Sequence, residues 1–139
     1  MLQWLFGKKS SSEKTLSAEE ISCGDFHLEI VGEYYYQDEL RRIAAGRTEK
    51  QERVEFKVVL LPEPDNQDDN NAVAVYAAGG SVIGYLSHEL AKEYQPAINS
   101  FIGATKSHPS CNAVMAGGYG KKSIGVWLDL DTDALLSHA

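Results

Sequence analysis

The segment between residues 63 and 72 gathers the side chains of this chain best suited to bind a ligand. It reads EPDNQDDNNA, and its oxygen-bearing side chains include Asp65, Asp68, Asp69, Asn70 and Asn71. Ca²⁺ accepts such oxygens, but an EF-hand loop also needs a central Gly and a closing Glu, and this segment has neither. Asp and Asn also form local turns by accepting hydrogen bonds from nearby backbone amides. The pattern therefore disfavours calcium and leaves two interpretations, a set of turns and the rim of a binding groove.

The other chemically reactive side chains of the sequence do not form a catalytic pattern. The histidines are scattered along the chain, at His27, His88, His108 and His138. No serine lies in a nucleophile elbow, and Cys23 and Cys111 have no partners at zinc-ligand spacing. The glycine-rich segment 117–120, followed by Lys121 and Lys122, resembles a phosphate loop only loosely. It is more often a plain turn, although the two lysines could contact a backbone phosphate. We therefore expect no enzyme activity, no cofactor and no metal.

Length and composition favour one ordinary domain. The chain has 139 residues, 43% of them hydrophobic and 24% charged, with a formal net charge of −7. No apolar run approaches the roughly 18 residues that a bilayer span requires, and the N-terminal MLQWLFGKK does not read as a secretory signal. We therefore expect the protein to be cytoplasmic and not to bind a membrane. The negative charge argues against coating duplex DNA by charge alone, but it does not exclude a small site for a nucleic-acid end.

Hydrophobic periodicity predicts the elements that would position these residues. Alternating apolar residues indicate strands at about 26–31 and 54–61, two strands within 71–86 joined at a Gly-Gly turn, and two more within 112–131. Helical spacing indicates helices at about 36–46 and 87–102, and Ser87 suits the N-cap of the second. The order β-α-β-β-β-α-β-β has too few helices for alternating βαβ winding, so it predicts a mainly β fold, a small barrel.

The same pattern predicts the domain organisation. Residues 1–22 are expected to be a flexible N-terminal tail, because 7–20 are polar without a sustained period. The barrel domain is expected over residues 23–134, and a short C-terminal tail over 135–139.

Three motifs, taken together and in order, resemble the HIRAN domain family. They read VGEYYYQDEL, VVLLPEPDNQDDNNAVAVY and VIGYLSHELAKEY, and the resemblance covers about residues 26–130. It implies an OB-like six-stranded β-barrel with two short α-helices. It also implies a module without catalysis of its own that binds single-stranded DNA at a free 3′ end, in DNA repair and beside a helicase or nuclease partner.

The resemblance assigns a role to the acidic segment. In the family pattern the position of Asp69 lies in the groove that receives the terminal sugar hydroxyl, and Asn71 belongs to the same loop. A carboxylate suits this role because it accepts a charge-assisted hydrogen bond from a 3′-hydroxyl and repels a 3′-phosphate.

Aromatic and basic residues complete the expected interface. Tyr35 and Tyr36 follow the first strand, and a tyrosine there could stack on a base, although Tyr36 could equally be a core residue that begins the helix. Tyr85 takes a position where a helicase-associated relative has a histidine, and it could stack or donate a hydrogen bond. His88 and Lys92 are spaced at i, i+4 on the second helix and could meet a phosphate or simply face solvent.

Changes in the acidic segment and at Tyr34 depart from the family pattern, and they keep a second function open. The family loop reads Asn-Pro-Tyr-Asp, whereas this chain has Asn66, Gln67, Asp68 and Asp69, and Tyr34 replaces a basic residue. Both changes make the expected site less positive. The alternative is a protein-interaction or regulatory domain that keeps the scaffold, has lost DNA binding and recognises a basic partner.

Overall fold

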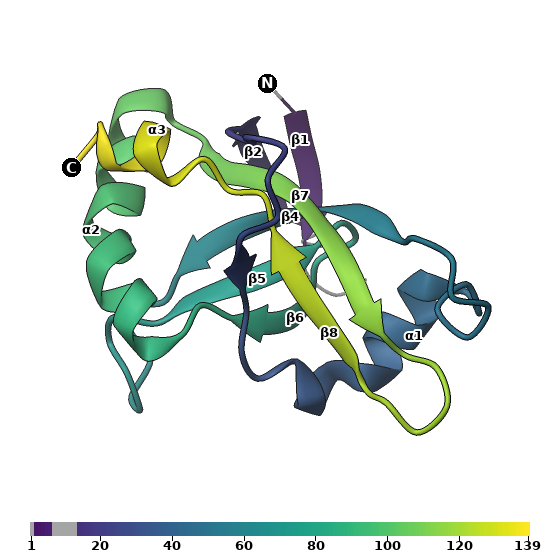
Figure 1. Cartoon of the computed structure of the whole chain (residues 1–139). Helices are drawn as coiled ribbons and strands as arrows, with labels where there is room; N and C mark the ends of the chain where they lie inside the picture. The colour runs from purple at the N-terminus through teal and green to yellow at the C-terminus, as the bar shows by residue number, and fades with distance from the viewer. Residues whose placement is uncertain (1, 7–13) are drawn as a thin grey trace.

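The chain forms a small β-barrel with helices packed around it (Figure 1). The computed structural model describes residues 2–6 and 14–139. The barrel strands are β3 (Leu28–Glu29), β4 (Glu55–Pro62), β5 (Val73–Ala77), β6 (Ser81–Tyr85), β7 (His108–Gly117) and β8 (Ile124–Leu128). The helices are the 3₁₀ helix η1 (Glu33–Tyr36) and the α-helices α1 (Gln37–Ala44), α2 (His88–Thr105) and α3 (Thr132–Leu136).

The six barrel strands form a ring that is closed at one narrow seam. They pair in the order β3, β8, β7, β4, β5, β6, and each of these pairs is antiparallel. The ring closes where Val31, just after β3, and Tyr85, the last residue of β6, exchange two backbone hydrogen bonds of 2.8 Å. The predicted fold class is confirmed: the protein is mainly β, and β3 to β8 with α1 and α2 follow the order β-α-β-β-β-α-β-β.

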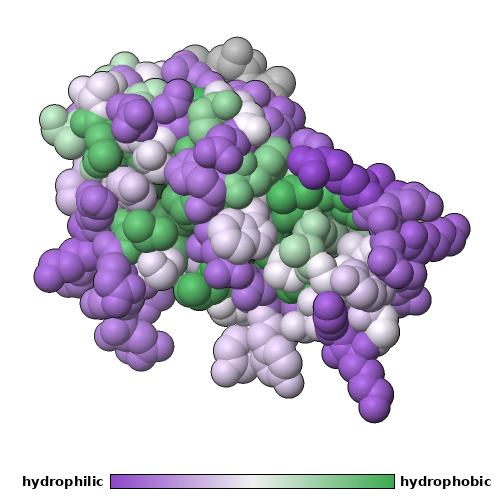
Figure 2. Space-filling view, in the orientation of Figure 1, coloured by the Kyte–Doolittle hydropathy of each residue, from purple (hydrophilic) through white to green (hydrophobic). Residues whose placement is uncertain are grey.

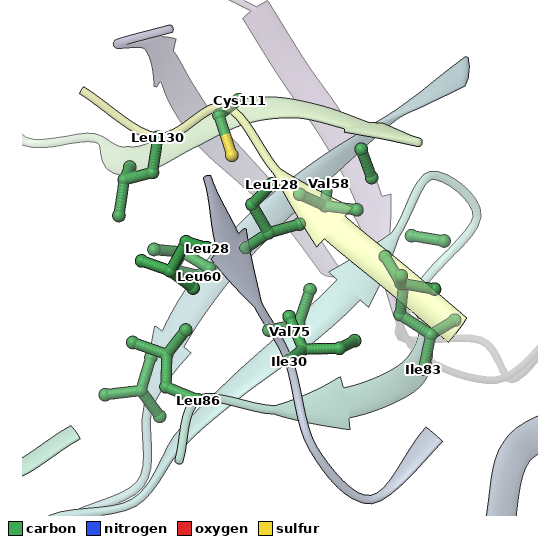
Figure 3. Packing of buried hydrophobic residues seen from close by; sticks show 14 of the residues in the cluster. Leu28, Ile30, Val58, Leu60, Val75, Ile83, Leu86, Cys111, Leu128 and Leu130 are labelled. Carbon is green, nitrogen blue, oxygen red and sulfur yellow. The ribbon is translucent and has the colours of Figure 1, made fainter. Parts of the chain in front are cut away.

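The interior of the barrel holds the residues that the alternating patterns predicted to be buried. Leu28, Leu60, Val75 and Leu128 come from four different strands and converge there (Figure 3). Their neighbours along each strand face outward, as the two-residue period of a strand requires. The glycine turns also lie where they were expected, since Gly79 and Gly80 take positive φ between β5 and β6. Ser87 caps α2 by accepting a hydrogen bond from the backbone N–H of Leu90.

The two N-terminal strands, which extend the same sheet, explain why the VVLL run of β4 is apolar without alternation. The strands β1 (Leu2–Phe6) and β2 (Lys14–Glu20) form an antiparallel pair, and β2 pairs in parallel with β7. Val59 points out of the barrel, where it is buried in a cluster with Ala18, Leu16, Leu61 and Tyr76. Both faces of β4 are therefore covered at this point.

The ends of the chain differ from what the sequence indicated. Residues 14–20 fall in the segment expected to be a flexible tail, yet they form a strand whose Ala18 is fully buried. Helix α3 was not predicted, and its buried Leu135 falls in the expected C-terminal tail. Asp131 caps this helix by accepting a hydrogen bond from the N–H of Ala134 at 3.0 Å. None of the helices in the described ranges is long and apolar enough to cross a membrane.

Candidate nucleic-acid interface

Residues 63–72, called the acidic loop below, connect β4 to β5 in a fixed conformation. The side-chain oxygen of Asn66 accepts hydrogen bonds from the backbone N–H groups of Asp68 at 2.9 Å and Asp69 at 3.1 Å. Its amide nitrogen donates to Glu63 Oε1 at 3.0 Å. The turn interpretation is thus confirmed for Asn66, and these turns hold the rest of the loop in place.

The carboxylate of Asp69 is held by two donors from different elements. Its Oδ1 accepts from the backbone N–H of Asn71, and its Oδ2 accepts from Nδ1 of His88, both at 2.9 Å. The hydrogen bond from His88 and then that from Asn71 lower the pKa of Asp69 below its ordinary value. The side chain of Asp69 is 24% exposed and that of His88 is 66% exposed. Asp69 is therefore an ionised, positioned acceptor that solvent can reach.

Tyr85 is tied to the same loop. Its hydroxyl donates to Glu63 Oε2 at 3.4 Å. Burial, and next the negative charge of Glu63, raise the pKa of Tyr85, so the phenol stays protonated. Because its backbone also closes the barrel seam with Val31, the position of the ring is set from two sides.

These residues line a cleft of about 320 Å³. Its walls are Asn66, Asp68, Asp69, Ala72, Tyr85, Leu86 and His88. The loop side of the cleft is fixed from behind by Gln95 of α2, whose amide nitrogen donates to the carbonyl oxygens of Asn70 at 3.0 Å and Ala72 at 3.1 Å. The structure therefore brings three of the predicted site residues, Asp69, Tyr85 and His88, to one concave surface.

The other two predicted aromatic residues, Tyr35 and Tyr36, lie on η1, which begins two residues after Val31 of the barrel seam. This helix packs against β6 and β8, and Gly32 at φ 78° turns the chain into it. Tyr35 is 82% exposed and Tyr36 is half-buried. In Figure 2 pale side chains project over this segment at the lower edge of the molecule, between the hydrophilic acidic loop and the hydrophilic β7–β8 hairpin.

The predicted basic residues do not converge on the cleft. Lys92 lies one helical turn after His88 on α2 and is exposed, but it is not part of the cleft wall. Lys121 and Lys122 belong to the β7–β8 hairpin, where the Lys122 ammonium lies 5.0 Å from the ring centre of Tyr119. No group of three or more His, Cys, Asp or Glu in the described ranges is arranged to hold a metal ion.

Sequence reasoning missed the structural partners within the site. Glu63 holds both Tyr85 and Asn66, and Asn66 sets the turn on which Asp69 depends. The spacing of Asn66 from Asp68 and Asp69 is the signal that could have identified it, since an Asx turn bonds amides two or three residues ahead. The pairing of His88 with Asp69 had no such signal, because it joins a loop to a helix.

Comparison with known proteins identifies a family for this geometry. The model of the HIRAN domain matches residues 23–113. Among solved structures, the chain is similar to the crystal structure of the HIRAN domain of human HLTF, with 19% sequence identity and a TM-score of 0.31. That match covers 63% of this chain and 88% of the HLTF domain. None of the curated proteins matches the chain.

Proposed function

The chain belongs to the HIRAN domain family, whose members are binding domains associated with nucleic acids, and on that premise we propose that it recognises single-stranded DNA at a free 3′ end. It has no catalysis of its own in this proposal. A helicase or nuclease partner would supply the chemistry, in the cytoplasm and in the context of DNA repair.

The observation that carries the proposal is the Asp69 carboxylate in the cleft. Asp69 is ionised, held at both oxygens and partly exposed, and the ring of Tyr85 lines the same cleft. Each carboxylate oxygen has two acceptor positions, so the bonds from Asn71 and His88 leave capacity for a sugar hydroxyl. A cleft of about 320 Å³ is at the small end of ligand sites and suits one terminal nucleotide.

The charge of the cleft supports selection of an end. A 3′-hydroxyl donates a hydrogen bond to Asp69, whereas a 3′-phosphate or a continuing strand would place negative charge against Asp69 and Asp68. His88 and Lys92 lie on α2 at the cleft and just beyond it, where they can contact the phosphate on the 5′ side of the terminal nucleotide.

Fluorescence anisotropy with a labelled single-stranded oligonucleotide tests the proposal. We expect the free 3′-hydroxyl strand to bind and the 3′-phosphorylated strand to bind at least about tenfold more weakly, because one charge-assisted hydrogen bond is replaced by repulsion. Equal affinity for both strands would refute end recognition.

Asp69→Asn sharpens this test because it preserves an oxygen for the N–H of Asn71 while removing the charge. It should lower affinity for the free end and reduce the discrimination against the phosphorylated end. Asp65→Asn is the matched control, since Asp65 is an exposed acid of the same loop outside the cleft wall. It removes the same charge and should leave the discrimination unchanged.

One observation favours a second candidate function. Besides Asp69, the acidic loop brings Glu63, Asp65 and Asp68 to this side of the barrel, and a basic peptide would meet a complementary charge there. Failure to bind any single-stranded oligonucleotide at physiological salt, together with binding of a lysine- and arginine-rich peptide that Asp68→Asn weakens, would favour a protein-interaction domain.

A further inference from the structure

Four basic side chains stand together at the end of the barrel away from the acidic loop (Figure 1). All four are exposed and come from two loops, the one between α1 and β4 and the β7–β8 hairpin: Arg47, Lys50, Lys121 and Lys122. The two loops touch, because Thr48 is buried where a Cβ added to Gly118 would lie 2.7 Å from its side chain. Figure 2 shows strongly hydrophilic side chains over this end of the molecule, at the right of the view. These four residues are called the basic corner below.

The cations of the basic corner are not neutralised inside the protein. Neighbouring arginines form ion pairs, Arg41 with Glu49 at 3.6 Å and Arg53 with Glu55 at 2.5 Å. In contrast, no ion pair within the described ranges joins a residue of the corner to a carboxylate. Segments 45–54 and 118–123 together hold five basic and two acidic residues, a formal net charge of +3 in a chain whose total is −7. This end is therefore positive although the protein is acidic.

The loop that carries Arg47 and Lys50 is fixed by its own hydrogen bonds. The carbonyl of Arg47 accepts from the N–H groups of Lys50 at 3.2 Å and Glu52 at 2.9 Å. The Arg47 side chain donates from Nε to the carbonyl of Ala44 at 3.3 Å, and in the part of the chain that the structure describes its two terminal nitrogens have no partner. A cation that is held in advance in this way loses less entropy when it binds an anion.

The basic corner is connected to the cleft along one side of the barrel. Gln37, directly after η1, accepts a hydrogen bond from the N–H of Ile124 at 2.8 Å and donates one to its carbonyl at 2.9 Å. Ile124 begins β8, just after the hairpin that carries the two lysines. Before η1, Val31 exchanges backbone hydrogen bonds with Tyr85, whose side chain lines the cleft. A strand that leaves the cleft along η1 therefore arrives at the basic corner.

The chemistry of the corner fits the phosphates of a nucleic acid better than an acidic peptide. A guanidinium group can bind a phosphate through two parallel hydrogen bonds, and an ammonium group binds it as a point charge. A nucleic-acid strand repeats its charge at every nucleotide, so cations on two adjoining loops can meet successive phosphates. The segment 26–40 contains no Lys or Arg, so the corner is the first group of unpaired cations beyond η1. An acidic peptide would have no such link to the cleft.

Resting on the proposed function, we propose that the basic corner is a second contact for the same DNA strand and binds phosphates several nucleotides upstream of the 3′ end. The protein then holds the strand at two places, its end in the cleft and its backbone at the corner. Because binding at the corner releases counterions, the affinity gained there falls as the salt concentration rises. It does not depend on base sequence or on the chemical state of the 3′ end.

Strands of graded length separate the two contacts in fluorescence anisotropy. A strand of about three nucleotides with a free 3′ end occupies the cleft alone, whereas one of about twelve also reaches the corner. We expect the longer strand to bind the wild type more tightly and with a steeper dependence of log affinity on log salt. Each phosphate contact of a single strand contributes a slope of about 0.7.

Lys50→Gln and Lys121→Gln remove one charge from each loop of the corner. Each should lower the salt slope for the longer strand by about 0.7 and weaken its binding about threefold, and neither should affect the short strand. Lys106→Gln is the matched control, because Lys106 is an exposed lysine without an ion pair at the C-terminal end of α2, outside the corner and the cleft wall. Since Lys50 and Lys121 are exposed, their variants should melt within about 1–2 °C of the wild type.

The outcomes separate this inference from the proposed function. If Lys50→Gln and Lys121→Gln bind the longer strand as Lys106→Gln does while a 3′-phosphate is still rejected, end recognition stands and the basic corner is refuted. If free and phosphorylated ends bind equally but the two variants weaken the longer strand, end recognition fails and the corner stands as a nucleic-acid contact. If no oligonucleotide binds, both fail. Equal affinity for short and long strands, together with binding of a glutamate-rich peptide that Lys50→Gln and Lys121→Gln weaken, would overturn the corner in favour of an acidic protein partner.

Discussion

Glu33, the first residue of η1, gives the protein a stability that should fall as the pH rises. One of its carboxylate oxygens, Oε2, is buried without a hydrogen-bond partner in the described part of the chain. Burial, and next the negative charge of Glu29, raise the pKa of Glu33 from 4.5 to about 7. Since the folded state binds this proton more tightly than the unfolded state does, the contribution to stability is complete below pH 4.5 and is lost as the pH rises through about 7.

The size of the effect follows from the same two values. At about 1.4 kcal/mol per pKa unit, the rise from 4.5 to about 7 sets an upper limit of about 3.4 kcal/mol. The side chain is only partly buried, so solvent screening reduces the expected change to about 1 kcal/mol. Glu33→Gln keeps the shape and is neutral at every pH. It should therefore raise the free energy of unfolding by about 1 kcal/mol at pH 8 and change it little at pH 4.5.

Urea denaturation of Glu33→Gln and the wild type at several pH values between 4.5 and 8 measures this. The comparison must be a difference between the two proteins, because burial lowers the pKa of His108 and makes stability fall on the acid side in both. Glu29→Gln is the informative control, since it removes the neighbouring charge and should flatten part of the slope. A stabilisation by Glu33→Gln that is equal at pH 4.5 and pH 8 would refute the assignment.

Three further predictions follow from contacts in the barrel and the cleft. Gly118→Ala should lower the free energy of unfolding by about 3 kcal/mol in urea denaturation, because φ is 80° and an added Cβ would lie 2.7 Å from atoms of two side chains. Gly120→Ala should lower it by only about 1 kcal/mol, because φ is 60° but an added Cβ would meet open space. Gln95→Leu should lower the free energy of unfolding by about 2 kcal/mol, because the carbonyl of Asn70 loses the Gln95 donor and the carbonyl of Ala72 keeps only the N–H of Glu63, and it should speed hydrogen exchange of the loop amides. Asp69 contributes stability above its ordinary pKa of 3.8 that is lost as the pH falls through its lowered folded value, and His88→Ala should raise the pKa of Asp69 in a carboxyl NMR titration. Equal costs for the two glycines, unchanged exchange, or an unchanged titration would contradict the respective reasoning.

The barrel could be predicted because the sequence signals of its strands, turns and helix caps each lie within a short segment. The two-residue alternation over residues 26–31, which include the short β3, and that over β8 each predict a strand within about ten residues of sequence. The glycines between β5 and β6 predict a turn just as locally. The cap of α2 at Ser87 is equally local. Few known folds have strands and helices in this order, so the mainly β class could be predicted from the sequence.

The N-terminal strands could not be predicted, because their pairing is distant and their sequence is polar. Strand β2 reads KTLSAEE, without the apolar alternation of a half-buried strand, and its partner β7 lies about ninety residues further along the chain. Helix α3 has only five residues, too few to show a helical period, and the apolar alternation of the preceding strand continues in the sequence through Asp131.

In the candidate site, too, local features could be predicted from the sequence and contacts between distant elements could not. The Asx turn at Asn66 is a local device and was among the interpretations of the acidic loop. The bond between Asp69 and His88 depends on how α2 is placed beside the loop, and the position of Lys121 and Lys122 depends on the length of the β7–β8 hairpin. The resemblance placed Asp69, Tyr85, His88 and three lysines in one interface, and the structure places Asp69, Tyr85 and His88 in the wall of one cleft that does not include Lys92, Lys121 or Lys122.

The two parts of the proposed interface, the cleft and the basic corner, depend on the same weak point of the barrel. The seam between β3 and β6 consists of the single bridge between Val31 and Tyr85. After Val31 the chain enters η1, which carries Tyr34 and Tyr35 and packs against β8 next to the basic corner, and after Tyr85 it enters α2, which carries His88. A strand of DNA that contacts both parts spans the bridge and adds contacts where the ring has the fewest hydrogen bonds. Since a ligand stabilises whatever it binds in the folded state, DNA should protect the amides of Val31 and Tyr85 from exchange more than those in the middle of β4. The proposed interface thus lies beside the strand pair that the fewest backbone hydrogen bonds hold together.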